Sequence, residues 1–104
     1  MKYTYVTLIR DPYIDDDGFT SYTGEYLDDQ NLVLFNTKDE AFNSAVKAAN
    51  EELITLNSNA DPDEYFSILE DDLYKTSNQV IINHYFHYSD EVQLVTRRRI
   101  LVVS

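Results

Sequence analysis

Both ends of this chain are rich in β-branched and aromatic residues, arranged in the two-residue period of β-strands. Residues 2–10 alternate in this way, and residues 79–88 and 92–103 have a similar composition on either side of Ser89-Asp90-Glu91. These segments predict a strand at the start of the chain and a hairpin at its end. The apolar positions of the hairpin share a face when its loop has an odd number of residues, so we expect an odd loop.

The middle of the chain carries two helix-start signals. Thr37-Lys38-Asp39-Glu40 is a capping box, which predicts a helix beginning there. Asp61-Pro62-Asp63-Glu64 combines an Asp cap with Pro at the first helical position, which predicts a second helix from about Pro62 to Tyr74. The apolar stripe of the first helix has spacings of three and four and comprises Phe42, Ala45, Val46, Ala49, Leu53 and Leu56.

Two further segments complete the predicted fold. Residues 32–35 form a short apolar run, which predicts a second strand or a piece of core. Residues 11–30 contain Pro12, Gly18 and Gly24 and show no sustained period, which predicts a long loop or an irregular excursion of the chain. We therefore expect an α+β fold, with two helices packed on a mostly antiparallel four-stranded sheet in the order β-β-α-α-β-β. The length of 104 residues predicts a single domain over residues 1–104.

Charge is strongly segregated along the sequence. Residues 11–74 contain 17 of the 19 acidic residues against Lys38 and Lys47, and the whole chain has a net charge of −11. A block of one sign acts over distance on charged partners, so this region should attract basic surfaces and repel nucleic acid. We expect no direct binding to nucleic acid and none to anionic membranes. The 43% hydrophobic content excludes a disordered acidic tail.

The composition also narrows the compartment and the chemistry. The chain has no Cys, and no stretch reaches the roughly 18 apolar residues that span a bilayer, so we expect a cytoplasmic protein. It has no glycine-rich phosphate loop, no G-x-S-x-G elbow and no kinase motif. We therefore predict a protein that is not an enzyme and requires no cofactor.

Two groups of residues resemble chemical sites in part. Asp15-Asp16-Asp17-Gly18 resembles the start of a calcium loop, but Tyr13 and Gly24 then occupy positions where ligands are needed. A solvated acidic turn is the favoured interpretation, and a calcium-regulated module is the weaker one. His84 and His87 lie three apart on a strand and point to opposite faces, with His84 on the core face. We assign no catalytic residue and no metal ligand.

Arg97-Arg98-Arg99 is the one basic run in the chain. A strand places Arg98 on the face opposite to Arg97 and Arg99, so the three guanidinium groups do not form one phosphate site. Internal pairing with the acidic helices is the favoured interpretation, and an interface is the second possibility.

Nine tyrosines exceed what a core of this size can bury with satisfied hydroxyls, so some are expected in contacts with a partner. Tyr13, Phe19, Tyr22 and Tyr26 form the best cluster; they either contact a partner or fold the 11–30 segment back onto the sheet, and both interpretations remain open. The residues that we assign to partner binding are Asp15, Asp16, Asp17, Tyr22, Tyr26, Asp63, Glu64, Glu70, Asp71 and Asp72.

In its size, its charge and its lack of catalytic motifs, the whole chain resembles small acidic phage-encoded inhibitors of host defence, such as anti-CRISPR and anti-restriction DNA mimics. Those families share no sequence signature, so the resemblance assigns no residue. It implies an inhibitor that occupies a basic site on a partner protein, with nucleic-acid-binding effectors among the candidates, in the cytoplasm of a host cell. The mimic would be the anionic outer face of the predicted second helix, from Asp63 to Asp72, together with Asp39, Glu40, Glu51 and Glu52 of the first helix.

The alternative is a structural or assembly protein that self-associates through exposed tyrosines and an edge strand. The sequence does not determine the oligomeric state.

Overall fold

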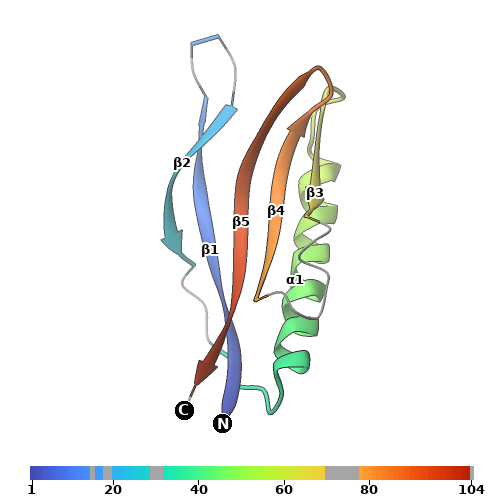
Figure 1. The fold of residues 1–104 in the computed structure, drawn as a ribbon. Coiled ribbons are helices and arrows are strands. Elements are labelled where there is room, and N and C mark those ends of the chain that lie inside the picture. The colour runs from blue at the N-terminus through green and yellow to red at the C-terminus, as the bar shows by residue number, and fades with distance from the viewer. Residues whose placement is uncertain (15, 18–19, 29–31, 70–77, 104) are drawn as a thin grey trace.

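In the part of the chain that the structure describes, a five-stranded antiparallel sheet with one helix against it forms the fold (Figure 1). The computed structural model describes residues 1–14, 16–17, 20–28, 32–69 and 78–103. Within them the elements are β1 (Lys2–Ile14), β2 (Thr20–Leu27), α1 (Lys38–Ser58), β3 (Glu64–Ile68), β4 (Gln79–Phe86) and β5 (Ser89–Val103). The strands lie in the order β2-β1-β5-β4-β3. The prediction of two helices on a four-stranded sheet was therefore wrong.

Helix α1 confirms the first capping signal and its apolar stripe. Thr37 is the N-cap, and its Oγ1 accepts a hydrogen bond from the Glu40 amide at 3.1 Å. This contact satisfies one of the amides that a helix start leaves unpaired. The residues that α1 contributes to the core are Ala41, Phe42, Ala45 and Ala49, which are buried, and Val46, Leu53 and Leu56, which are partly buried.

Replacing Thr37 with Ala should lower the free energy of unfolding by about 1 kcal/mol, because the Glu40 amide loses its acceptor. Thr55→Ala is the matched control: Thr55 is exposed inside the same helix, where Ala is the better helix former. Urea unfolding of the two variants measures the difference. Equal stabilities would show that the cap contributes nothing.

The segment predicted as a long loop, residues 11–30, is largely strand. Pro12 is tolerated in β1 because β5 pairs with β1 only as far as Ile9, so beyond that point one edge of β1 has no strand beside it. Gly24 has a φ of 68° and lies in β2 beside a register shift between Ile9 and Asp11. Such a conformation suits a glycine at a β-bulge. Pro12 and Gly24 thus mark an open edge and a bulge within a hairpin.

The predicted second helix is absent from the described part of its range. Residues Glu64–Ile68 form β3, which pairs with β4. Pro62 and Asp63 lie in a turn, where the Asp61 amide donates to Glu64 Oε1 at 3.1 Å, so the capping contact forms without a helix. Burial alternates along β3, with Phe66 buried and its neighbour Tyr65 exposed. The remainder of the predicted helix, residues 70–74, lies outside the described residues.

The last turn of α1 covers the backbone of the edge strand β3. Asn57 Oδ1 accepts from the Phe66 amide at 2.8 Å, and Asn57 Nδ2 donates to the Phe66 carbonyl at 3.0 Å. One side-chain amide therefore satisfies both backbone groups of Phe66, as a neighbouring strand would.

The predicted C-terminal hairpin is confirmed, but its loop is even. Phe86 pairs with Ser89, so two residues connect β4 and β5. A register shift between Ile82 and Asn83 then changes the pairing with β5 by one residue. Because a one-residue shift moves side chains to the other face, Val80 and Ile82 share a face with Ile100 beyond this bulge in spite of the even loop. Val92 and Leu94, before the bulge, pair with Tyr85 and Asn83 on the other face.

Residues 32–35 do not form the predicted strand. Phe35 makes an isolated bridge with Tyr3, with two backbone hydrogen bonds of 2.9 and 2.7 Å, and packs partly against the core. Leu32, Val33 and Leu34 are exposed. The segment therefore connects the sheet to the start of α1 and contributes one side chain to the core.

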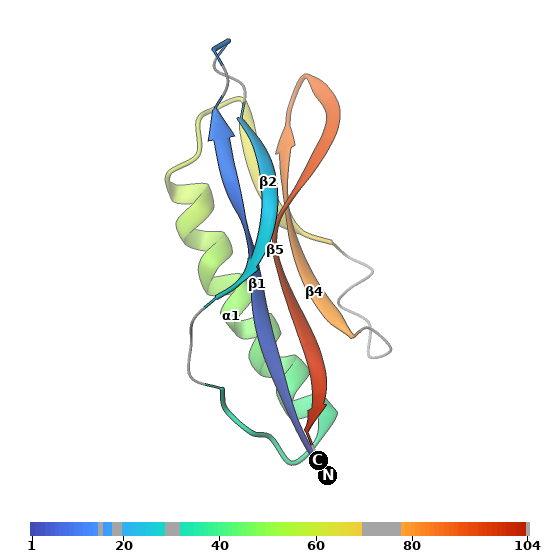
Figure 2. The same ribbon diagram turned by 90° about the vertical axis from the view of Figure 1, so that its left-hand side faces the viewer.

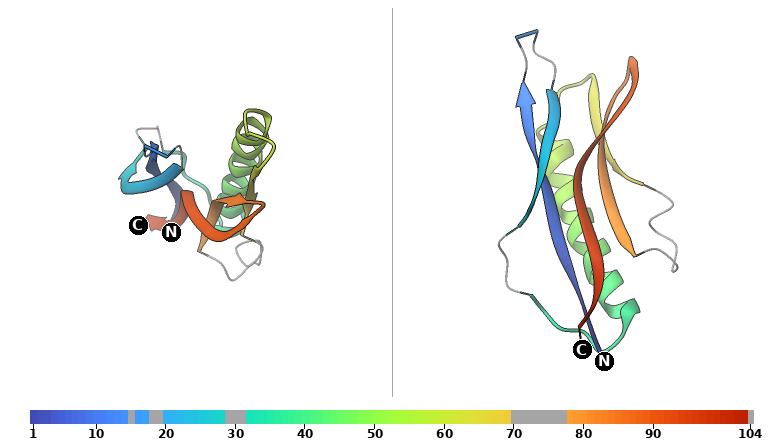
Figure 3. Two further views of the ribbon diagram at one scale, coloured as in Figure 1. Left: turned by 90° about the horizontal axis from the view of Figure 1, so that it is seen from above. Right: turned by 60° about the vertical axis from the view of Figure 1, so that its left-hand side comes forward.

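The sheet has a helix face, against which α1 packs, and an outer face on the opposite side (Figure 2). Val80, Ile82 and Ile100 belong to the buried cluster that contains the alanines of α1. Seen end-on, the sheet curls, with β1 and β2 on one side of β5 and β4, β3 and α1 on the other (Figure 3, left). The molecule measures 49 × 24 × 21 Å, and both termini lie at one end of its long axis (Figure 1).

Candidate functional site

Three connections lie at the end of the molecule opposite the termini (Figures 1 and 3). They are the β1–β2 connection, the α1–β3 connection and the β4–β5 turn with the first residues of β5. Each carries two exposed acidic residues, and we call these six the acidic end: Asp16, Asp17, Asp61, Asp63, Asp90 and Glu91. Segregation of charge along the sequence thus becomes segregation of charge along the long axis.

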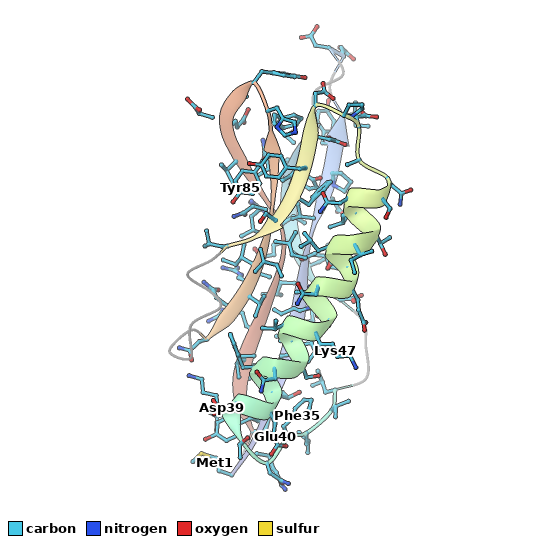
Figure 4. The ribbon with its side chains drawn as sticks, turned by 90° about the vertical axis from the view of Figure 1, so that its right-hand side faces the viewer. Met1, Phe35, Asp39, Glu40, Lys47 and Tyr85 are labelled. Atoms are coloured by element: carbon cyan, nitrogen blue, oxygen red, sulfur yellow. The ribbon has the colours of Figure 1, made fainter. Side chains whose placement is uncertain are left out.

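None of the described cations lies in the three connections, and Arg10 of β1, the nearest of them along that strand, donates to the Gly24 carbonyl at 3.2 Å. Lys2 and Lys38 are at the end of the molecule that holds the termini, and Lys47 lies in the middle of α1 (Figure 4). Arg97 forms an ion pair with Glu25, and Arg98 forms one with Glu52. These pairs neutralise acidic side chains in the middle of the molecule and leave unbalanced negative charge at its end.

The Arg98 contact confirms the predicted internal pairing with an acidic helix. Arg98 Nη2 lies 2.9 Å from Glu52 Oε2, which joins β5 to α1 across the helix face. Arg97 pairs with β2 instead, and Arg99 is exposed. The three arginines are therefore divided between partners, as the strand period predicts.

The acidic end also exposes large apolar and aromatic side chains. Tyr13, Ile14 and Tyr88 are more than half exposed, with fractions of 58%, 67% and 68%. The Tyr88 hydroxyl donates to Asp63 Oδ2 at 2.5 Å. This hydrogen bond is the main reason why the pKa of Asp63 is lowered and the pKa of Tyr88 is raised. Asp63 therefore stays ionised while Tyr88 holds its carboxylate in place.

A buried polar network lies beneath the acidic end. His84 on β4 is 1% exposed, and its Nε2 lies 2.7 Å from Glu64 Oε2 on β3. Its Nδ1 lies 3.2 Å from the Tyr22 hydroxyl on β2. A carboxylate only accepts hydrogen bonds, so Nε2 carries the proton toward Glu64. The centroids of the Phe66 and Phe86 rings lie 4.4 and 4.6 Å from the centroid of the imidazole. Together with the burial and the two hydrogen bonds, these contacts confirm His84 as a hydrogen-bonded core residue.

The Tyr22 hydroxyl of this network resists ionisation. Burial, and then the charge of Glu64, raise the pKa of Tyr22 to about 12. Tyr22 therefore stays protonated at neutral pH, and its hydrogen bond with His84 connects β2 to β4 and β3 beneath the acidic end.

The network predicts a loss of stability at alkaline pH. In the range between 10.0 and about 12, the unfolded state loses the Tyr22 proton while the folded state keeps it. The stability present below pH 10.0 should therefore fall as the pH rises through this range. Urea unfolding at about pH 9 and about pH 11 should show a smaller fall in Tyr22→Phe than in the unmodified protein. Identical falls would mean that the folded state does not shift this pKa.

The structure brings three of the predicted partner-binding residues, Asp16, Asp17 and Asp63, to the same end. Two others are engaged internally, since Glu64 pairs with His84 and Tyr22 packs partly against the core. Tyr26 is 47% exposed and lies near the far end of β2. The tyrosine cluster thus divides, with Tyr22 folded inward and Tyr13 and Tyr26 exposed. Asp15, Phe19, Glu70, Asp71 and Asp72 lie outside the described residues.

Sequence reasoning missed Asp61, Asp90 and Glu91. Asp61 was interpreted as a helix cap, and the other two as residues of a hairpin loop. The signal was present, because the predicted hairpin and the end of the first helix both place acidic residues in connections. Only the order of the strands shows that these connections lie at one end of the molecule.

The metal interpretation receives no support from the described residues. Among them, no three His, Cys, Asp or Glu side chains are grouped so as to hold a metal ion. His87 is exposed at the β4–β5 turn, whereas His84 is buried. Within the part of the chain that the structure describes, no helix is long and apolar enough to cross a membrane.

Comparison with known proteins found no significant similarity to any family model, curated protein or solved structure.

Proposed function

We propose that this protein is a non-enzymatic inhibitor whose acidic end occupies a basic site on a partner protein, including sites that otherwise bind nucleic acid. One observation supports the proposal above all: three connections, distant in sequence, place six exposed acids at one end of an elongated molecule. None of the described Lys and Arg residues lies in these connections.

Electrostatics explains why such an end would suit a basic site. A concentrated negative potential steers a basic surface toward it and raises the association rate. Duplex DNA presents a charge about every 1.7 Å of axis, so a protein that competes for a DNA-binding cleft needs several carboxylates in fixed positions. Here four of the carboxylates lie in connections and two at the start of β5, and Tyr13 and Tyr88 add exposed rings of the kind that anchor interfaces.

The mimic surface differs from the one predicted from the sequence. The outer face of a second helix was expected to carry the charge, but Glu64 belongs to β3 and pairs with His84. Asp39 and Glu40, also considered as contributors, lie at the start of α1, at the end that holds the termini (Figure 4). The proposal therefore rests on the connections at the acidic end.

Affinity capture from a cell lysate tests this function. The immobilised protein should retain a basic protein at low salt and release it at high salt. The variant Asp16→Lys, Asp61→Lys, Asp90→Lys, with one reversal in each connection, should lose that protein. The control, Asp39→Lys, Glu40→Lys, Glu51→Lys, changes the net charge equally on exposed positions of α1 and should keep it. Loss in both variants would mean that only net charge matters, and retention in both would contradict the proposal.

The alternative, self-assembly, is favoured by one feature. β2 is an edge strand, and it exposes Tyr26 and Leu27 at 47% and 60%. Unpaired edges and exposed rings promote pairing between copies. Light scattering should then show a defined oligomer that Tyr26→Lys disrupts and that reversal of the acidic end leaves intact. A monomer at all concentrations would remove this alternative.

A further inference from the structure

Three aromatic rings form a ladder on the outer face of the sheet, next to the acidic end. Tyr65 on β3 is paired with Tyr85 on β4, and their rings are stacked, with centroids 5.0 Å apart and an angle of 10° between the planes. The His87 ring lies 5.0 Å from Tyr65. Tyr65 is 40% exposed, and His87 is exposed at the turn. The side-chain view shows Tyr85 beside β3, away from α1 (Figure 4).

The ladder does not belong to the core. Its strand neighbours, Phe66 on β3 and His84 on β4, point to the helix face, where they stack on each other beneath the acidic end. Tyr65 and Tyr85 alternate with them and point to the opposite side. Among the described residues, β3 is an edge strand of the sheet. Tyr65 and His87 are exposed and Tyr85 is partly buried, so the rings of Tyr65 and His87 are available to a ligand.

Asp63 adds a fixed negative charge at one end of the ladder. Its backbone carbonyl accepts from the His87 amide at 2.9 Å, and its side chain accepts from Tyr88. Both residues of the β4–β5 turn therefore hydrogen-bond to Asp63, which precedes Tyr65 by two positions. On the other strand of the hairpin, Val92 pairs with Tyr85, whereas Glu91 accepts from Gln93, which pairs with His84 on the opposite face. Asp63 is therefore the carboxylate of the acidic end that borders the aromatic surface.

We infer that this ladder binds an arginine side chain of the partner protein, with the guanidinium against the exposed Tyr65 ring, which stacks on Tyr85, and its charge toward Asp63. This inference rests on the proposed function and specifies the partner's chemistry. A guanidinium is planar and weakly hydrated, stacks on aromatic rings and forms paired hydrogen bonds with carboxylates. A lysine ammonium is compact and strongly hydrated, so it gains less from the rings.

Nucleic-acid bases also stack on aromatic rings, but their phosphates would meet the carboxylates of the acidic end. Repulsion between like charges therefore excludes DNA and RNA strands as occupants, whereas an arginine satisfies both the rings and the acids. Charge complementarity thus selects a basic protein segment.

Two peptides of equal charge test the inference, one with eight arginines and one with eight lysines. At fixed ionic strength, the protein should bind the arginine peptide about fivefold tighter than the lysine peptide. Tyr65→Leu or Tyr85→Leu should bring the two affinities together, while Tyr65→Phe, which keeps the ring, should retain the preference. Tyr13→Leu, at the same end but outside the ladder, is the matched control and should also retain it.

The outcomes separate this inference from the function on which it rests. Equal binding of both peptides, lost on reversal of the acidic end, would overturn the arginine site and leave the acidic binding function standing. Binding of neither peptide would count against both. Preferential binding of a single-stranded oligonucleotide would overturn the arginine site, and so would an arginine preference that survives in both leucine variants.

Discussion

Replacing Ile82 with Ala should lower the free energy of unfolding by about 4 kcal/mol. Ile82 is fully buried in β4 and belongs to the cluster that joins the sheet to the alanines of α1. Those alanines have no further side-chain atoms with which to fill the space, so a cavity should remain between the layers. Its cost adds to the lost transfer free energy of the missing methyl and methylene groups.

Ile54→Ala provides the matched control for this substitution. Ile54 lies on α1 and is 69% exposed, so the same chemical change should alter stability by less than about 0.5 kcal/mol. Urea unfolding measures both changes in the free energy of unfolding. The slope of that free energy against urea concentration should be the same in all the proteins. If the two substitutions cost the same, the core does not lie between β4 and α1.

Removing the carboxylate of Glu52 should have the second-largest effect, about 3 kcal/mol. The Arg98 side chain is 9% exposed and does not lose its proton, so without Glu52 it becomes a buried charge with no acid beside it. Among the described residues, Arg98 Nε and Nη1 have no hydrogen-bond partner, so nothing else compensates. Glu52 is itself 26% exposed, which places the expected cost at the lower end for a buried pair.

The double variant Glu52→Ala, Arg98→Met provides the control. Replacing both charges removes the unpaired guanidinium while keeping most of its apolar contacts, so stability should return to within about 1 kcal/mol of the unmodified protein. Urea unfolding of the single and double variants forms the comparison. A double variant no more stable than Glu52→Ala would show that lost packing, and not a buried charge, causes the effect.

Local signals predicted the elements that local physics determines. The capping residue Thr37 and the apolar stripe of α1 were predicted correctly, because a helix start depends on contacts within one turn. The C-terminal hairpin was also predicted, since its strands are long and rich in β-branched residues. Its even loop was not predicted, because the bulge beside Ile82 restores the apolar register at a distance from the turn.

The other elements depend on neighbours that are distant in sequence. In the sequence alone, Pro12 and Gly24 indicate a loop. In the structure they lie in strands, because β1 has no strand beside one edge at Pro12 and β2 has a bulge at Gly24. Residues 61–64 do make a capping contact, yet the chain continues as a strand because β4 pairs with it and Asn57 covers its other side. Tertiary pairing therefore overrides a valid local signal.

The candidate site was predictable in its chemistry but not in its location. The acidic block and the surplus of tyrosines indicated an anionic, aromatic binding surface, and Asp16, Asp17 and Asp63 belong to the acidic end. The acidic end itself depends on the strand order, which brings the β1–β2 connection to the same end as the β4–β5 turn. No local pattern encodes that order.

The most direct test of the central claim is the salt dependence of binding to the captured partner. For the unmodified protein, log Kd should rise steeply with log salt concentration, because several carboxylates at the acidic end pair with basic groups. The control with Asp39→Lys, Glu40→Lys and Glu51→Lys in α1 should show the same slope. The variant with Asp16→Lys, Asp61→Lys and Asp90→Lys at the acidic end should show a much flatter slope and weaker binding at low salt. A slope that is equal in all three proteins would contradict the claim that the acidic end makes the contact.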